Sequence, residues 1–113
     1  MLRIFVLEDM WIRIQWFKHK FKDCELKICT NADDAISILT NDRDWDYMFL
    51  DHDLGNRIFI PITDENSGSR VAKFLSQFDI KSKIIIHSCN GEGAKNMLSY
   101  LPSAEHIMFG SFT

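Results

Sequence analysis

The chain has 113 residues, of which 46% are hydrophobic and 26% are charged, and its formal net charge is −3. This balance excludes a disordered protein and predicts one globular domain over residues 1–113. The negative charge, without a long block of Lys or Arg, excludes sequence-independent DNA binding. No stretch of about 20 apolar residues and no signal-peptide pattern occur, so we expect no membrane span. Three cysteines without a Cys-x-x-Cys pair predict reduced thiols and a cytoplasmic location.

The first part of the chain predicts two strand–helix pairs. An apolar run over 2–7 predicts a strand, after which Asp9 is placed to cap a helix. That helix has one apolar face, formed by Met10, Ile14, Phe17 and Phe21. The alternating pattern over 25–29 is typical of a half-exposed edge strand. Thr30 or Asn31 then caps a second amphipathic helix.

The middle of the chain contains the most apolar of the predicted strands. The continuous apolar run over 47–50 is typical of a strand covered on both faces. The segment 55–66 that follows is longer and more apolar than most strand–helix connections, and we interpret it as a lid or a small hairpin. Ser67 or Ser69 then begins a third helix.

The last part of the chain repeats the alternation. Residues 83–88 predict a fourth strand, and Gly91 and Gly93 lead into a fourth helix that Pro102 stops. Residues 106–109 predict the last strand.

This alternation predicts a three-layer α/β sandwich with right-handed crossovers. An edge-like second strand and a central first strand favour a five-stranded parallel sheet of order 2-1-3-4-5. This is the flavodoxin-like arrangement, in which ligands bind at the switch point between strands one and three. No helix is predicted after the fifth strand, so one face of the sheet is under-covered. We expect a long loop or a contact between copies of the chain to cover that face.

Acidic residues follow two strands that this order places side by side. Glu8 and Asp9 follow the first strand, and Asp51 follows the third. Carboxylates gathered in this way repel one another unless protons or a cation intervene, so a hard divalent ion such as Mg²⁺ is expected. Asp53 is either a further ligand or a turn former. Helix and turn capping is the structural alternative for each of these residues taken alone.

Two histidines follow strands three and four at the same predicted edge. His52 and His87 are candidates for general acid–base work, because an imidazole exchanges a proton near neutral pH. Each has two alternatives, which are to orient another residue or to bind a metal.

Four further residues are candidates to bind a phosphate group. Ser88 and Asn90 precede a helix start and offer a hydroxyl, an amide and backbone N–H groups to an anion. Arg57 and Arg70 flank the segment 55–66, and planar guanidinium groups bind phosphate oxygens well. Ordinary solvation at the surface is the alternative for both arginines.

The chain resembles the receiver domain of two-component signalling over nearly its whole length. The resemblance rests on Glu8-Asp9 after the first strand, Asp51 after the third and Ser88 after the fourth. It implies that the acidic residues hold Mg²⁺, that Asp51 takes a phosphoryl group and that Ser88 hydrogen-bonds to it. Receivers also carry a Lys after the fifth strand, where this chain has Phe-Gly-Ser at 109–111, and a fifth helix. Without that ammonium group, a phosphoryl group on Asp51 loses a fixed partner.

Additional residues resemble one receiver-like family, the cyclic-phosphate-processing receivers. They are Asp-His-Asp-Leu-Gly at 51–55, Ser-Gly-Ser-Arg at 67–70, and His-Ser-Cys-Asn at 87–90, followed by Gly93-Ala94 and Met97. The resemblance implies handling of the cyclic phosphate ends of RNA or of related nucleotides.

Together, these patterns predict a metal-dependent phosphoesterase that binds or opens the cyclic phosphate of a nucleotide or an RNA end. Glu8, Asp9 and Asp51 are expected to hold Mg²⁺ or Mn²⁺, which polarises a phosphoryl oxygen. One of His52 and His87 then acts as the base on a water molecule, and the other protonates the departing ribose oxygen. Two alternatives are an atypical response-regulator receiver phosphorylated on Asp51 and a non-catalytic interaction module.

Overall fold

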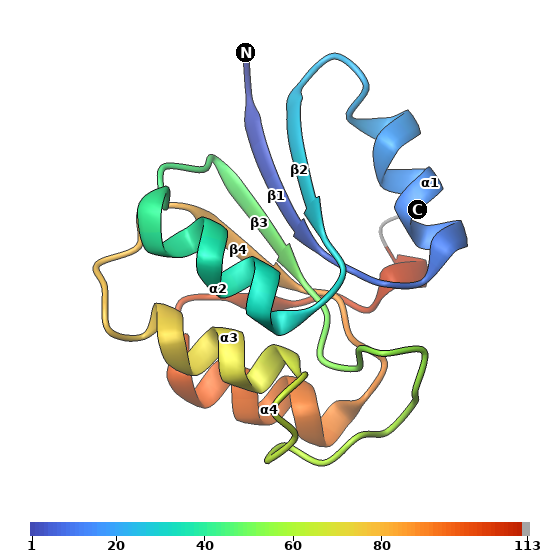
Figure 1. Cartoon of the computed structure of the whole chain (residues 1–113), viewed down its shortest axis with the longest axis vertical. Helices are drawn as coiled ribbons and strands as arrows, with labels where there is room; N and C mark the ends of the chain where they lie inside the picture. Colours follow the sequence, from blue (N-terminus) through green and yellow to red (C-terminus); the bar gives the residue numbers. More distant parts are fainter. Residues whose placement is uncertain (112–113) are drawn as a thin grey trace.

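The computed structural model describes residues 1–111, whose five strands form one parallel sheet in the order β2-β1-β3-β4-β5 (Figure 1). The strands are β1 (Arg3–Leu7), β2 (Glu25–Cys29), β3 (Tyr47–Leu50), β4 (Lys83–Ile86) and β5 (Glu105–His106). This order confirms the flavodoxin-like prediction. β1, β3 and β4 lie in the centre because they are apolar on both faces, and most of their residues are buried. β2 lies at an edge and exposes alternate residues.

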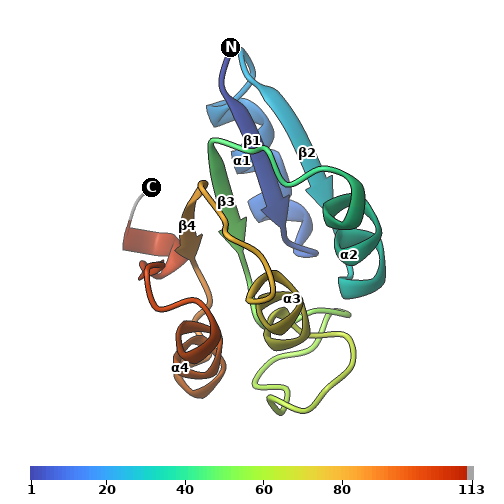
Figure 2. The ribbon, with the colours of Figure 1, turned by 90° about the vertical axis from the view of Figure 1, so that its left-hand side faces the viewer.

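Four helices cover the sheet: α1 (Trp11–Lys20), α2 (Ala32–Asn41), α3 (Gly68–Leu75) and α4 (Gly91–Tyr100). The apolar sides of α2, α3 and α4 pack on one face, against Met48 and Leu50 of β3. On the other face, Phe17 of α1 packs against Ile4 and Phe49. Figure 2 shows α1 and α2 on opposite sides of β1 and β2. Within residues 1–111, no helix is long and apolar enough to cross a membrane.

Three of the helices begin where the sequence predicts. The side chains of Asn31, Ser67 and Asn90 each accept an N–H of the first turn and act as the N-caps of α2, α3 and α4. α1 begins after Met10, which provides no side-chain cap. The prediction that Asp9 caps this helix is wrong, because its carboxylate instead accepts the N–H of Asn56 at 2.6 Å.

The end of the chain differs from the strand predicted over 106–109. β5 has only two residues, and Phe109–Ser111 form a short 3-10 helix. The Phe109 ring packs on the rings of Trp16 and Phe17, with centroids 5.3 and 5.9 Å apart. This turn therefore covers part of the sheet face on which α1 lies. Association between copies of the chain through that face stays a prediction.

Residues 55–66 form a loop without a helix or a regular strand, and an isolated antiparallel bridge at Asp53 closes its base. Asn56 and Phe59 adopt left-handed φ angles of 57° and 52°. Their N–H groups donate to the carboxylates of Asp9 and Asp53, each at 2.6 Å. These two carboxylates hold the loop against the carboxyl edge of the sheet, so the segment is a lid-like loop and not a hairpin.

Candidate functional site

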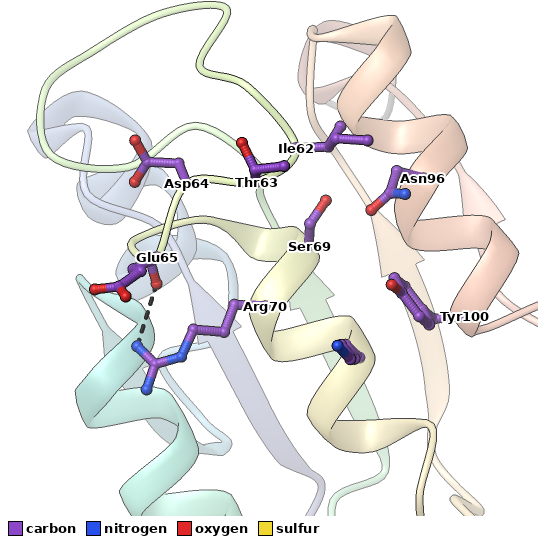
Figure 3. A pocket seen from close by; sticks show the side chains of 9 residues that line it. Ile62, Thr63, Asp64, Glu65, Ser69, Arg70, Asn96 and Tyr100 are labelled. Carbon is purple, nitrogen blue, oxygen red and sulfur yellow. Dashed lines mark hydrogen bonds between the residues drawn. The ribbon is translucent and has the colours of Figure 1, made fainter.

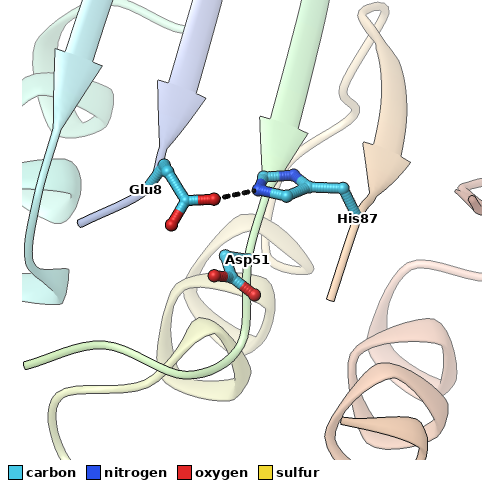
Figure 4. A group of neighbouring side chains, drawn as sticks. All are labelled: Glu8, Asp51 and His87. Atoms are coloured by element: carbon cyan, nitrogen blue, oxygen red, sulfur yellow. Dashed lines mark hydrogen bonds and ion pairs between the residues drawn. The ribbon is translucent and has the colours of Figure 1, made fainter. Parts of the chain in front are cut away.

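Three side chains meet at the carboxyl edge of the sheet. Glu8, Asp51 and His87 directly follow β1, β3 and β4, which are neighbours in the sheet. Parallel strands end at a common edge, so residues in these positions lie side by side. One ligand atom of each side chain lies within 4.8 Å of the other two, and at most 5% of each residue is exposed. Figure 4 shows the three side chains converging between the strand ends.

Hydrogen bonds fix the orientation of these groups. One Glu8 oxygen lies 3.0 Å from Nε2 of His87, and the other accepts the backbone N–H groups of the next two residues at 3.1 Å. Asp51 accepts the N–H of His52 through Oδ1 at 2.8 Å. The backbone therefore holds both carboxylates in place before any ligand arrives, which is the preorganisation that a binding or catalytic site requires.

Burial and charge set the protonation of the two carboxylates. Burial raises the pKa of Asp51 to about 7, a shift that His87 opposes and Glu8 increases. Burial also disfavours the charge of Glu8, but the hydrogen bond and charge of His87, the N–H of Met10 and the charge of Arg13 together outweigh it and lower the pKa of Glu8. Near neutral pH, Glu8 is therefore ionised, and Asp51 is able to exchange a proton.

Arg13 balances the charge of this cluster, and the sequence analysis did not identify it. Its Nη1 lies 3.6 Å from Glu8 and 3.9 Å from Asp51. Its guanidinium carbon lies 4.9 Å from the centroid of the Phe109 ring, which supports it from the other side. A single Arg on a helix forms no motif. The signal that points to it is its position in the first turn of α1, next to the end of β1.

A pocket of about 210 Å³ opens beside Glu8, Asp51 and Arg13. Further predicted site residues that line it are Asp9, Asp53, Arg57 and Ser88. This volume is smaller than the roughly 300–1,000 Å³ of pockets for drug-sized ligands. The pocket therefore fits a group smaller than a whole nucleotide.

Arg57 and Ser88, which both line this pocket, make different contacts. Arg57 forms a bidentate pair with Asp64 at 2.8 and 3.1 Å, so its guanidinium braces the loop 55–66. The Ser88 hydroxyl oxygen accepts the N–H of Asn90 at 3.0 Å, which leaves its O–H as a donor to a bound anion. Of the two, Ser88 is the better placed to contact a phosphate group.

The structure does not bring His52 to Glu8 and Asp51, contrary to expectation, and pairs it with Asp53 instead. The ring is fully buried, with Nδ1 2.9 Å from Asp53 and Nε2 2.9 Å from the hydroxyl of Ser69. Both ring nitrogens therefore have partners, and His52 does not line the pocket at Asp51. The physical reason is that successive residues in extended chain point to opposite sides, so when Asp51 faces the pocket His52 faces away from it.

Asn90 and Arg70 also have partners away from the cluster. Asn90 caps α4 and donates to Asp53 at 3.0 Å and to the carbonyl of Ile60 at 3.2 Å. Arg70 pairs with Asp33 and lines a different pocket, beside α3 and α4. The structure therefore gives both residues contacts other than the expected phosphate.

Solved structures with a similar fold are receiver domains of response regulators. A Thermotoga maritima response regulator in complex with Mg²⁺-BeF has a TM-score of 0.71 and 20% identity, covering 96% of this chain and 86% of that chain. A CheY-like receiver domain from Methylobacillus flagellatus has a TM-score of 0.70 and 16% identity, covering 99% and 92%. A Burkholderia pseudomallei response regulator with a phosphorylated aspartic acid and a calcium ion has a TM-score of 0.71 and 13% identity, covering 96% and 59%. At these identities the likeness shows the fold alone.

A comparison with curated proteins gave no match. A family model described as the cyclic-phosphate processing receiver domain matches residues 5–103. This range runs from β1 to beyond α4 and includes Glu8, Asp51 and His87. Since the match extends over most of the chain, the chain belongs to the family of cyclic-phosphate processing receiver domains.

Proposed function

We propose that this domain binds a divalent metal ion at Glu8, Asp51 and His87 and opens a cyclic phosphate bound beside it. The observation that carries the proposal is the convergence of two carboxylates and an imidazole within 4.8 Å. Such a group attracts a cation, because its carboxylates repel one another. The family supplies the class of substrate, a cyclic phosphate.

The donor set favours Mn²⁺ over Mg²⁺. Mg²⁺ is bound mainly by oxygen ligands, whereas an imidazole is a ligand suited to transition metals. Glu8 and Asp51 supply oxygen donors and His87 supplies the nitrogen. When bound, the ion would polarise a phosphoryl oxygen and lower the pKa of a water molecule.

Residues of the chain bind the phosphate anion, and the attacking water molecule supplies the proton. Arg13 lies close enough to Glu8 and Asp51 to balance phosphate charge, and the Ser88 hydroxyl donates to a phosphate oxygen. Ring opening forms a bond from water oxygen to phosphorus and breaks the bond to one ribose oxygen, which leaves with a proton. A bound ion would keep Asp51 ionised as a ligand, and the attacking water molecule, made more acidic by the ion, would supply the proton that the ribose oxygen takes.

The test is incubation of the full chain with 2′,3′-cyclic nucleotides and Mn²⁺ or Mg²⁺, followed by chromatography of the products. We expect metal-dependent conversion to nucleoside monophosphates and a loss of rate of about 100-fold or more in D51N. D79N removes an exposed carboxylate outside the pocket and is the matched control, which should keep the wild-type rate. The proposal is abandoned if no ring opens and if cyclic phosphates bind no more tightly than linear ones.

A second candidate function is phosphorylation of Asp51. The observation that favours it is Arg13, which lies 3.9 Å from Asp51 and offers a cation in a chain without the receiver Lys. Acetyl phosphate with Mg²⁺ should then add one phosphoryl group to the wild-type chain and none to D51N. An unmodified wild-type mass under these conditions counts against this candidate.

A further inference from the structure

His52, Asp53 and Ser69 form a hydrogen-bonded chain that the proposed function does not use. Oδ1 of Asp53 lies 2.9 Å from Nδ1 of His52, and Nε2 of the same ring lies 2.9 Å from Oγ of Ser69. A carboxylate, an imidazole and a hydroxyl in this order form the arrangement by which serine hydrolases activate their nucleophile. The chain of bonds joins the end of β3 to the first turn of α3.

The Asp53 carboxylate fixes the direction of proton donation. It accepts the N–H of Phe59 at 2.6 Å and the side-chain amide of Asn90 at 3.0 Å. Both carboxylate oxygens of Asp53 act as acceptors, one for the Phe59 N–H and the other for the Asn90 amide. With Asp53 as the acceptor, Nδ1 of His52 donates to it, and Nε2 accepts from the hydroxyl of Ser69.

The imidazole of His52 is held in a fixed orientation. The residue is fully buried, and a Cβ atom at Gly93 of α4 would lie only 2.3 Å from its ring. Glycine at this position therefore lets α4 pack directly on the imidazole. A ring confined in this way keeps Nε2 directed at Ser69, as a catalytic base requires.

Ser69 lines a pocket of about 340 Å³ that is separate from the pocket at Asp51. The pocket lies beside α3 and α4 and is closed on one side by residues 62–65 (Figure 3). Figure 3 shows the Ser69 side chain pointing toward Ile62. Ser69 lies in the first turn of its helix, where the N–H of Gly68 donates to the carbonyl of His52 and the N–H of Arg70 donates to the hydroxyl of Ser67. These two backbone donors therefore hold the helix start in place beside Ser69.

We propose that Ser69, His52 and Asp53 form a second site, which hydrolyses small carboxylic esters. Oγ of Ser69 attacks the carbonyl carbon and passes its proton to Nε2 of His52. The ester C–O bond breaks, and the alcohol leaves with that proton while the acyl group stays on Ser69. A water molecule then gives a proton to His52 and attacks the acyl carbon. The carboxylic acid is released, and the proton returns to Ser69.

The walls of the pocket define the class of ester. Ile62 and Tyr100 provide apolar surface, whereas Asp64, Glu65, Arg70 and Lys73 make the rest of the wall charged. A volume of about 340 Å³ is near the lower end of the range for small-molecule sites. We therefore expect an ester with a short acyl group. This inference goes beyond the proposed function. Of Ser69, His52 and Asp53, only Asp53 also lines the pocket at Asp51.

The first experiment uses a fluorophosphonate probe on the full chain. An activated serine displaces fluoride from phosphorus and keeps the phosphonate, and peptide mass spectrometry locates the adduct. We expect the adduct on Ser69 in the wild-type chain and its loss in S69A. S76A removes an exposed hydroxyl just after α3 and is the matched control, which should label like the wild type. A wild-type chain without an adduct on Ser69 overturns the proposal.

A second measurement distinguishes a serine that is activated by His52 from one that the probe merely reaches. With p-nitrophenyl butyrate, we expect S69A and H52Q each to lower the rate of hydrolysis by about 100-fold or more. Asp53 acts through His52 as a positioning residue, so D53N should lower the limiting rate of labelling and leave the half-saturating probe concentration unchanged. Hydrolysis by S69A at the wild-type rate overturns the proposal even if H52Q fails to fold. Chelation of metal should stop ring opening and spare ester hydrolysis, so failure of either proposal is seen separately.

Discussion

Ionisation of Asp51 is unfavourable in the folded chain because the side chain is buried next to another carboxylate. It is 5% exposed, and the second carboxylate of the cluster, Glu8, lies beside it. With a pKa of about 7, the folded chain holds a proton on Asp51 between roughly pH 4 and pH 7, where the unfolded chain has lost it. Stability therefore falls as the pH rises through this window. Above it, the full penalty of an ionised buried carboxylate remains.

We expect D51N to stabilise the metal-free chain above neutral pH. The amide avoids the burial of a charge, so the free energy of unfolding should rise by about 2–4 kcal/mol at pH 8. The gain should shrink as the pH falls toward 4, because the folded chain then holds the proton on Asp51, and it should vanish below about pH 3, where Asp51 is protonated in both states. Urea unfolding at several pH values measures this difference, with D79N as a control that shows no such trend. A D51N variant less stable than the wild type at pH 8 would contradict the assignment.

At the scale of elements, the loop 55–66 is the least regular part of the structure that touches the site. Two of its residues, Asn56 and Phe59, have positive φ angles, which side chains other than Gly rarely adopt. Asn tolerates this conformation better than Phe does. The hydrogen bond from the Phe59 N–H to Asp53 holds the backbone there at a strain of about 1–2 kcal/mol. The same carboxylate orients His52, so this loop and the Ser69 pocket depend on one anchor.

We expect F59G to relieve this strain. The Phe59 side chain is 71% exposed, so little packing is lost, and the free energy of unfolding should stay the same or rise by up to about 1 kcal/mol. I58G is the matched control, since Ile58 is equally exposed without a positive φ and should lose about 0.5–1 kcal/mol. Chemical denaturation measures both. Equal losses in the two variants would contradict the strain argument.

Elements were easier to predict from the sequence than the directions of side chains. Strand order and the caps at Asn31 and Ser67 follow from local patterns, because a cap or a buried strand involves few neighbours. His52 was expected beside Asp51, although successive residues of an extended chain point to opposite sides. Its partner Ser69 and the covering helix α4 are distant in sequence, so its actual contacts were not evident. Arg13 was missed because it takes its role from contacts with Glu8, Asp51 and Phe109 that only the folded chain provides.

At the scale of the whole molecule, the two faces of the sheet are covered unequally. Three helices pack on one face, whereas α1 and the turn at Phe109–Ser111 cover the other. Phe109 contacts Trp16 and Phe17 and also supports the guanidinium of Arg13. The position of Phe109 therefore affects the position of the Arg13 guanidinium, which balances the charge of Glu8 and Asp51.

We expect F109A to destabilise the fold by about 1–2 kcal/mol, because a partly buried aromatic contact is lost. The released Arg13 should also weaken binding of inorganic phosphate to the site. Urea unfolding and isothermal titration calorimetry measure the two effects. M108A is the control, since Met108 is 49% exposed and its removal should change stability by less than about 0.5 kcal/mol. Unchanged stability in F109A would contradict the packing role of the turn.

Glu8 and His87, which touch in the folded chain, are 79 residues apart in sequence. Pairs so remote meet late during folding, because a long stretch of chain must first lose its conformational freedom. A nascent or partly folded chain therefore contains no preformed metal-binding site. An ion that binds there would bind only the folded chain, and by mass action would shift the folding equilibrium toward the folded state.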